Sequence, residues 1–116
     1  MVVDWIGQDE ADQIFAALAD ATRRDILTRV LRQEASVSRL AERYPMSFAA
    51  VQKHVAVLER ATLVTKERRG REQIVRGDVG TIQAAARLLD EYEEIWRGRI
   101  GRIEDLLAEP LPGDVS

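Results

Sequence analysis

The sequence has no cysteine among its 116 residues, which excludes disulfide bonds, thiolate nucleophiles and cysteine ligands for a metal. Histidine is nearly as scarce, since His54 is the only one. A metal site would need carboxylates for most of its ligands, and the sequence has no His-Glu-x-x-His motif. Nucleophile–base spacings and glycine-rich phosphate loops are missing too. We therefore expect no metal, no other cofactor and no enzymatic activity.

Long apolar runs are also missing, because no stretch approaches the roughly 18 residues of a membrane-spanning helix. The opening residues, MVVDWIGQDEAD, are acidic and are not expected to act as a secretory signal. The length suits a single domain. We expect a cytoplasmic protein with one domain over residues 1–110 and a flexible tail over residues 111–116.

Charged residues are plentiful but unevenly distributed along the chain. Residues 1–20 contain five acidic and no basic side chains, residues 21–77 contain 13 basic and 6 acidic ones, and residues 78–116 contain 4 basic and 9 acidic ones. The net charge is −3. A basic middle between acidic ends favours a binding surface for a polyanion, although solvated charged faces would give the same pattern.

Hydrophobic periodicity predicts four helices in the first half of the chain, over residues 10–19, 20–33, 37–44 and 47–61. The last three of these have residues that are favoured as N-caps, namely Asp20, Ser36 and Ser47. Arg23 and Arg24, at the start of the second helix, are weak candidates for phosphate contacts, because they can pair locally with Asp20 or Asp25.

Residues 64–76 have β-favouring residues at both ends and Gly70 between them, which predicts a two-stranded hairpin. A long helix is expected to follow, up to about residue 108. Two short helices joined by a tight turn and followed by a basic hairpin form a winged helix-turn-helix. The predicted fold class is mainly α, with a two-stranded wing and a long C-terminal dimerisation helix.

The helix over residues 47–61 separates into two faces when its residues are placed at intervals of about 100°. Val51, Val55 and Leu58 form one face, which should contact the core, and His54 lies beside them. A packed imidazole is the simpler interpretation of His54, and a ligand role is the alternative. Ala49 and Lys53 lie on the opposite face with Gln52 beside them, and Phe48 lies on the border between the two faces. At its N-terminal end the helix is expected to offer outward small residues, one aromatic residue, an amide and a lysine: Ser47, Phe48, Ala49, Gln52 and Lys53.

This outward face suits the major groove of DNA. Small side chains allow close approach, Gln52 can pair with a base edge such as that of adenine, and Lys53 can reach guanine or a phosphate. Phe48 can rest on a thymine methyl group or, alternatively, pack into the core. Recognition helices contact bases with their N-terminal residues, as this arrangement would.

The hairpin carries the densest positive charge of the chain. Arginines near a projecting turn can lie along phosphates or enter a narrow minor groove, and a solubilising turn is the alternative. The candidate DNA-binding residues here are Lys66, Arg68, Arg69 and Arg71, and Arg76 adds to the charge.

Apolar residues recur every seven positions along the last helix, at Ile82, Leu89, Trp96 and Ile103. A repeat of seven sustained over this length favours packing against another helix. We therefore expect a homodimer, with closure of the monomer core as the alternative. The candidate interface residues are Trp5, Ile14, Phe15, Leu89, Tyr92, Trp96, Ile100 and Ile103.

These segments together resemble the ArsR family of winged helix-turn-helix repressors. The resemblance rests on ALADATRRDIL at 17–27, SVSRLAERYPMS at 36–47, AAVQKHVAVLERATLV at 49–64, ERRGREQIVR at 67–76 and YEEIWRGRIGRIEDLLAE at 92–109. It implies a homodimer, formed by the first and last helices, that binds an imperfect inverted repeat in double-stranded DNA and represses transcription.

The sequence departs from the family pattern at several positions. The Cys-x-Cys motif of metal-sensing members is replaced by SVSRLAER. Other members bind metal through histidines on the last helix, and this last helix has none, so neither metal site carries over. Phe48 stands where glutamine is more common. Thr62 stands where glycine is common, and a positive φ there would cost on the order of 1 kcal/mol. The predicted function is a dimeric, sequence-specific DNA-binding repressor, and the alternative is a winged-helix protein-interaction module that does not bind DNA.

Overall fold

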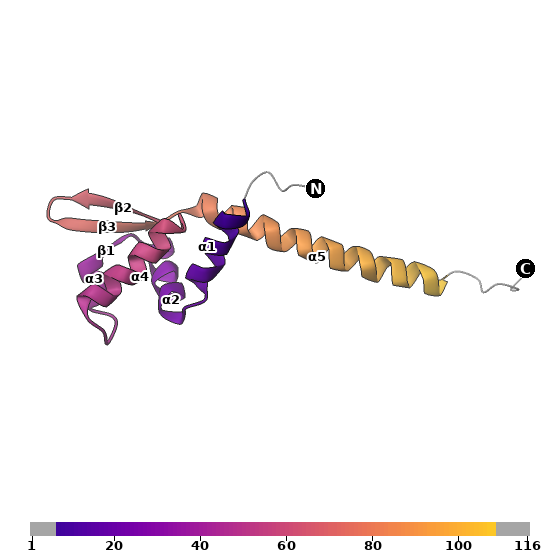
Figure 1. Ribbon diagram of the computed structural model, residues 1–116, viewed down its shortest axis with the longest axis horizontal. Helices are drawn as coiled ribbons and strands as arrows, with labels where there is room; N and C mark the ends of the chain where they lie inside the picture. The colour runs from indigo at the N-terminus through magenta and orange to yellow at the C-terminus, as the bar shows by residue number, and fades with distance from the viewer. Residues whose placement is uncertain (1–6, 109–116) are drawn as a thin grey trace, which may run out of the picture. The chain divides into compact units, whose positions relative to one another are not determined.

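The computed structural model describes residues 7–108 and contains five helices and three strands within that range (Figure 1). The elements follow the order α1 (Gln8–Leu18), α2 (Ala21–Arg32), β1 (Ala35–Ser36), α3 (Val37–Ala41), α4 (Phe48–Arg60), β2 (Val64–Arg69), β3 (Glu72–Gly77) and α5 (Val79–Ala108). The predicted winged helix-turn-helix fold is confirmed, with α3 and α4 as the helix-turn-helix and β2–β3 as the wing.

The chain divides into two compact units, and the boundary between Ala85 and Ala86 falls inside α5. The first unit therefore contains α1 to β3 and the first two turns of α5. The expected single domain over residues 1–110 stays a prediction, and the predicted tail at 111–116 lies outside the described residues.

The three predicted N-caps are confirmed. Asp20 Oδ2 accepts a hydrogen bond from the Arg23 backbone N–H at 3.0 Å, which caps α2. The hydroxyls of Ser36 and Ser47 cap α3 and α4 in the same way. Each cap satisfies one of the backbone donors that a helix leaves unpaired at its start, so these local contacts fix where α2 and the two helices of the helix-turn-helix begin.

The sheet has three antiparallel strands in the order β1-β3-β2, so it has one more strand than the two-stranded hairpin that the sequence predicted. Gly70 has φ 65° in the turn between β2 and β3, a conformation that glycine adopts without strain. The additional strand is only Ala35–Ser36, which pairs with Val75 and Ile74. A strand of two residues is too short to produce an alternating sequence pattern.

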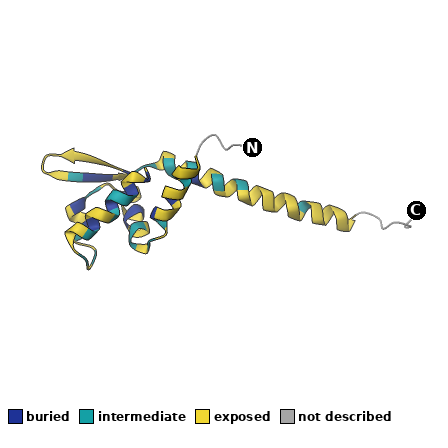
Figure 2. Ribbon diagram, in the orientation of Figure 1, coloured by how far each residue is buried: buried dark blue, intermediate teal, exposed yellow. Residues whose placement is uncertain are grey.

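The hydrophobic core lies in the first unit (Figure 2). Val51, Val55 and Leu58 are fully buried, so the predicted inner face of α4 is confirmed. Leu31 of α2 is 42% exposed, at the edge of the core, and its side chain lies beside the backbone of Gly77. In the second unit no residue between 86 and 108 is buried.

Thr62 has a φ of 62°, the only positive φ among the described non-glycine residues. Its N–H donates to the Glu59 carbonyl at 2.9 Å, and the Leu63 N–H donates to the Leu58 carbonyl at 3.0 Å. These two bonds form a Schellman motif that ends α4, and this motif places its first residue beyond the cap in the left-handed region. Glycine is favoured there, so Thr62 holds the end of α4 at a cost in strain.

We expect Thr62→Gly to raise the free energy of unfolding by about 1 kcal/mol, because glycine relieves the left-handed strain more than it increases the entropy of the unfolded chain. Urea denaturation measures the change. Thr62→Ala is the control, since it retains Cβ and should give little of the gain. Equal stabilisation by both variants would show that the strain at φ is not the cause.

Candidate DNA-binding surface

The outward face of α4 is exposed at its N-terminal end. Phe48 is 46% exposed, and Ala49, Gln52 and Lys53 are also exposed. Ser47 is exposed too, but its hydroxyl accepts the Ala50 N–H at 3.1 Å and so serves the helix cap. All five predicted residues are exposed at the N-terminal end of α4. At about 100° per residue, Ala49 and Lys53 lie opposite the buried Val51–Val55–Leu58 face, and Phe48 lies at its border.

The turn that connects α3 to α4 is anchored to α2 through Tyr44. Its hydroxyl donates to Asp25 Oδ2 at 2.6 Å, and Arg29 Nε donates to the same oxygen at 2.9 Å. Burial raises the pKa of Tyr44 to about 12, and the hydrogen bond to Asp25 adds to the effect. The same two donors lower the pKa of Asp25. This contact fixes the helix-turn-helix against the helix that precedes it.

We expect Tyr44→Phe to lower the free energy of unfolding by about 1 kcal/mol at neutral pH, because it removes a hydrogen bond to a charged group. The folded state raises the pKa of Tyr44 from 10.0 to about 12, so its contribution is complete below pH 10 and is lost as pH rises towards 12. Urea unfolding of both proteins at a series of pH values measures this. A difference between them that persists unchanged to pH 12 would contradict the assignment.

His54 lies on the inner side of α4, half-buried against the start of α2. Its Nδ1 is 3.4 Å from Arg23 Nη1 and 3.8 Å from Asp20 Oδ2. The hydrogen bond that the Asp20 carboxylate accepts from the Arg23 backbone N–H is the main cause of the lowered pKa of Asp20, and the electrostatic interaction with His54 lowers this pKa further. Within residues 7–108 no group of three potential metal ligands occurs. His54 thus links α4 to the N-cap of α2.

The side chains of Arg23 and Arg24 bind the end of α1 and do not make the local ion pairs considered from the sequence. Arg23 Nε donates to the Ala17 carbonyl at 2.7 Å, and Arg24 Nη1 donates to the Leu18 carbonyl at 2.7 Å. Helices leave their last four carbonyls without partners, and arginines satisfy them well. Two adjacent arginines after a short helix are the sequence signal for this role.

Two of the wing arginines are already paired with carboxylates. Arg69 donates to Glu34 Oε2 at 2.6 Å and to Glu67 Oε1 at 2.7 Å, and Arg76 Nη2 lies 3.4 Å from both Glu34 Oε1 and Glu67 Oε1. The hydrogen bond from Arg69 lowers the pKa of Glu67, and Glu67 in turn raises the pKa of Arg69. These four residues form the wing ion-pair cluster, which no local sequence pattern reveals because Glu34 lies 35 positions before Arg69.

The remaining cationic side chains of the wing differ in whether they form ion pairs. Lys66 Nζ lies 3.4 Å from Glu59 Oε1, at the last turn of α4. Arg68 and Arg71 make no ion pair with any residue between 7 and 108, and both are exposed. Side chains alternate between the two faces of a strand, so Arg68 lies on the same face as Lys66 and on the face opposite the Arg69 side chain. Arg68 and Arg71 are therefore the most available of the predicted wing contacts.

The residues predicted for a dimer interface fall into two groups in the structure. Ile14 is 2% exposed and belongs to the core of the first unit, so it offers no surface to a partner. Trp5 lies outside the described residues. The others are exposed apolar side chains: Phe15 at 38%, Leu89 at 54%, Tyr92 at 59%, Trp96 at 56%, Ile100 at 37% and Ile103 at 47%.

None of the helices in the described part of the chain is long and apolar enough to cross a membrane.

Several proteins of known sequence or structure are similar to this chain. A family model described as a helix-turn-helix domain matches residues 18–67. The HTH-type transcriptional regulator Rv2034 of Mycobacterium tuberculosis is 35% identical over 81 residues, which are 70% of this chain and 76% of that protein. The ArsR-like transcriptional regulator from Rhodococcus sp. RHA1 has a similar structure, with a TM-score of 0.75 and 36% identity over 89% of this chain and 96% of that chain.

A more distant structure shares the fold. The homodimeric winged helix-turn-helix DNA-binding domain Mb0332 from Mycobacterium bovis, solved in solution, is 23% identical, with a TM-score of 0.61 over 74% of this chain and 81% of that chain.

The fold, the exposed face of α4 and the basic wing define a winged helix-turn-helix transcriptional regulator with a DNA-binding domain. Within that class, the chain belongs to the ArsR family.

Proposed function

We propose that this protein is a homodimeric repressor that binds an inverted-repeat operator through α4 and the wing, and that it acts in the cytoplasm. The observation that carries the proposal is the exposed N-terminal face of α4, where Gln52 and Lys53 stand beside small residues on a helix whose opposite face is buried. Such a helix enters the major groove and contacts base edges with its first two turns.

The wing supplies the contacts that do not depend on sequence. Arg68 and Arg71 have no carboxylate partner within residues 7–108 and can bind phosphates or a narrow minor groove directly. Lys66 and Arg69 bind a phosphate only if they first break their ion pairs with Glu59 and Glu34. Ser47 contributes mainly by setting the start of α4, and Ala49 contributes by being small.

The exposed apolar row of α5 supports the dimer. Leu89, Trp96 and Ile103 repeat every seven residues, and all three are about half exposed in the single chain. Exposed apolar surface of this extent marks a protein–protein interface in soluble proteins. A dimer also suits an inverted repeat, because two-fold symmetry in the protein matches two-fold symmetry in the operator. The Mycobacterium bovis domain, which has the same fold, is homodimeric.

Selection of bound sequences from random duplex DNA, at low and at high salt, tests the proposal. We expect two related half-sites in inverted orientation, with centres about 10 base pairs or a multiple of that apart, and affinity that falls steeply with salt. Recovery of single half-sites would contradict the dimer. Failure to enrich any sequence would favour the alternative, a protein-interaction module that does not bind DNA, which the acidic ends of the chain would suit.

We expect Phe48→Ala to lower operator affinity about fivefold while it changes the free energy of unfolding by less than about 1 kcal/mol, since Phe48 is 46% exposed. Fluorescence anisotropy with labelled operator and urea denaturation measure the two quantities. A core phenylalanine would instead cost about 3–5 kcal/mol on truncation. A loss of stability of that size would mean that Phe48 packs inside the protein.

A further inference from the structure

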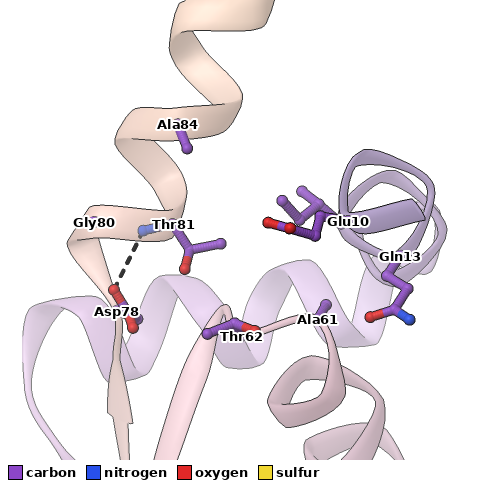
Figure 3. A pocket seen from close by; sticks show the side chains of 9 residues that line it. Glu10, Gln13, Ala61, Thr62, Asp78, Gly80, Thr81 and Ala84 are labelled. Carbon is purple, nitrogen blue, oxygen red and sulfur yellow. Dashed lines mark hydrogen bonds between the residues drawn. The ribbon is translucent and has the colours of Figure 1, made fainter. Parts of the chain in front are cut away.

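A cavity of about 280 Å³ opens beside Thr62, within the first unit, where three segments meet (Figure 3). One wall comes from α1, another from the turn that ends α4, and the third from the first turns of α5. The volume is just below the roughly 300–1,000 Å³ of typical small-molecule sites, so only a small ligand fits. None of the predicted DNA-binding residues lines this cavity.

The charged lining of the cavity is entirely acidic. Glu10 from α1 and Asp78 from the start of α5 are the two ionisable residues that line it, and no lysine, arginine or histidine does. Asp9 and Asp12, both exposed on α1, add negative charge nearby. Asp78 Oδ1 accepts the Thr81 N–H at 3.2 Å as the N-cap of α5, which leaves Oδ2 for another partner. The electrostatic character of the cavity therefore favours a cation.

The cavity also has unused hydrogen-bonding groups and an apolar floor. Within residues 7–108, the side chains of Glu10, Gln13 and Thr62 form no hydrogen bond, and neither does the Thr81 hydroxyl. Figure 3 shows Glu10 and Asp78 on different sides of the cavity, with Thr62 between them. Ile14 and Ala61, 2% and 5% exposed, are among the apolar residues that line it. Acceptors on several sides of an apolar floor suit an ammonium group carried on a short hydrocarbon chain.

We propose that this cavity binds a short aliphatic diamine, with one ammonium group at Glu10, the other at Asp78, and the hydrocarbon over Ile14, Ala61 and Ala84. A bare divalent cation fits less well, because such ions take six or more oxygen ligands, most of them negatively charged or fixed carbonyls, and the described residues offer no group of three carboxylates here. The ligand would contact Thr62, the residue that ends α4, so the site is placed to influence the recognition helix.

Titration of the full chain with 1,4-diaminobutane tests the proposal in the absence of DNA, so the result does not depend on the proposed function. Calorimetry should give saturable binding at millimolar concentration or below, and NMR spectra should show chemical-shift changes centred on Thr62, Thr81 and Ala84. 1,4-Butanediol, which has the same length and no charge, should do neither. No saturable binding of the diamine, or equal binding of the diol, would overturn the proposal.

Two variants locate the site. Glu10→Gln and Asp78→Asn remove a charge each with little change in shape, and asparagine caps a helix about as well as aspartate. Each should weaken diamine binding about tenfold, as the loss of a charge-assisted hydrogen bond does. Asp12→Asn is the matched control, because it removes the same charge from an exposed position of α1 that does not line the cavity. An equal loss in all three variants would overturn the proposal, and the chemical-shift map of the unmodified protein gives an independent test if a variant does not fold.

Discussion

Replacing both Trp96 and Ile103 by aspartate is expected to convert the protein into a monomer and to reduce its affinity for the operator by at least about 100-fold. These side chains are 56% and 47% exposed in the single chain, so the variant should keep its core. In a dimer they would be buried against the partner, where an unpaired carboxylate is strongly unfavourable. A monomer contacts one half-site at a time and therefore loses the gain in affinity that comes from linking two half-sites.

Sedimentation at micromolar concentration measures the oligomeric state, and anisotropy with labelled operator measures the affinity. Gln83→Asp is the control, because it introduces one carboxylate at a position about 140° around the helix from Trp96, away from the apolar row. We expect it to remain a dimer. A Trp96→Asp/Ile103→Asp protein that still sediments as a dimer would exclude this face of α5 as the interface.

Removal of Gln52 should change which DNA sequences the protein prefers, whereas removal of Arg68 should weaken binding to all of them. Gln52→Ala loses a base contact that is worth about 1–3 kcal/mol of discrimination, or roughly 5- to 150-fold between the preferred base and the others. Arg68→Ala loses a phosphate contact and should reduce the slope of log affinity against log salt concentration by about one. Binding to the operator and to single-base variants of it, at several salt concentrations, separates the two effects.

Arg69→Ala provides a control on the same strand. Arg69 is held by Glu34 and Glu67 in the free protein, so its removal should weaken DNA binding less than Arg68→Ala does. A larger loss from Arg69→Ala would show that the wing ion-pair cluster opens in the complex. A uniform loss from Gln52→Ala, with no change in preference, would mean that Gln52 contacts the backbone.

The local parts of the fold could be predicted from the sequence because each has a short-range cause. Asp20, Ser36 and Ser47 cap helices by bonds to residues three positions ahead, and the buried face of α4 follows from its spacing of three and four residues. The exposed face of α4 follows from the same periodicity. The left-handed conformation at Thr62 was indicated by the resemblance to a family that often has glycine there.

The features of the fold that the sequence did not predict depend on contacts between residues far apart in the chain. Tyr44 binds Asp25 across 19 positions, and Arg69 binds Glu34 across 35, so no local pattern reveals either pair. Strand β1 forms because β3 lies beside it and has little propensity of its own. Ile14 and Phe15 have the same periodicity in the sequence, and only the packing of α1 decides that Ile14 enters the core.

The wing ion-pair cluster has a consequence for the search along a chromosome. An arginine that must leave a carboxylate before it binds a phosphate loses the energy of the first ion pair, so its contact would add less to non-specific affinity than that of an arginine without such a partner. In the proposed complex, Glu34 and Glu67 would thereby shorten the residence time at sequences where the base contacts of α4 cannot form. Less time on such DNA would speed the return of the protein to its operator.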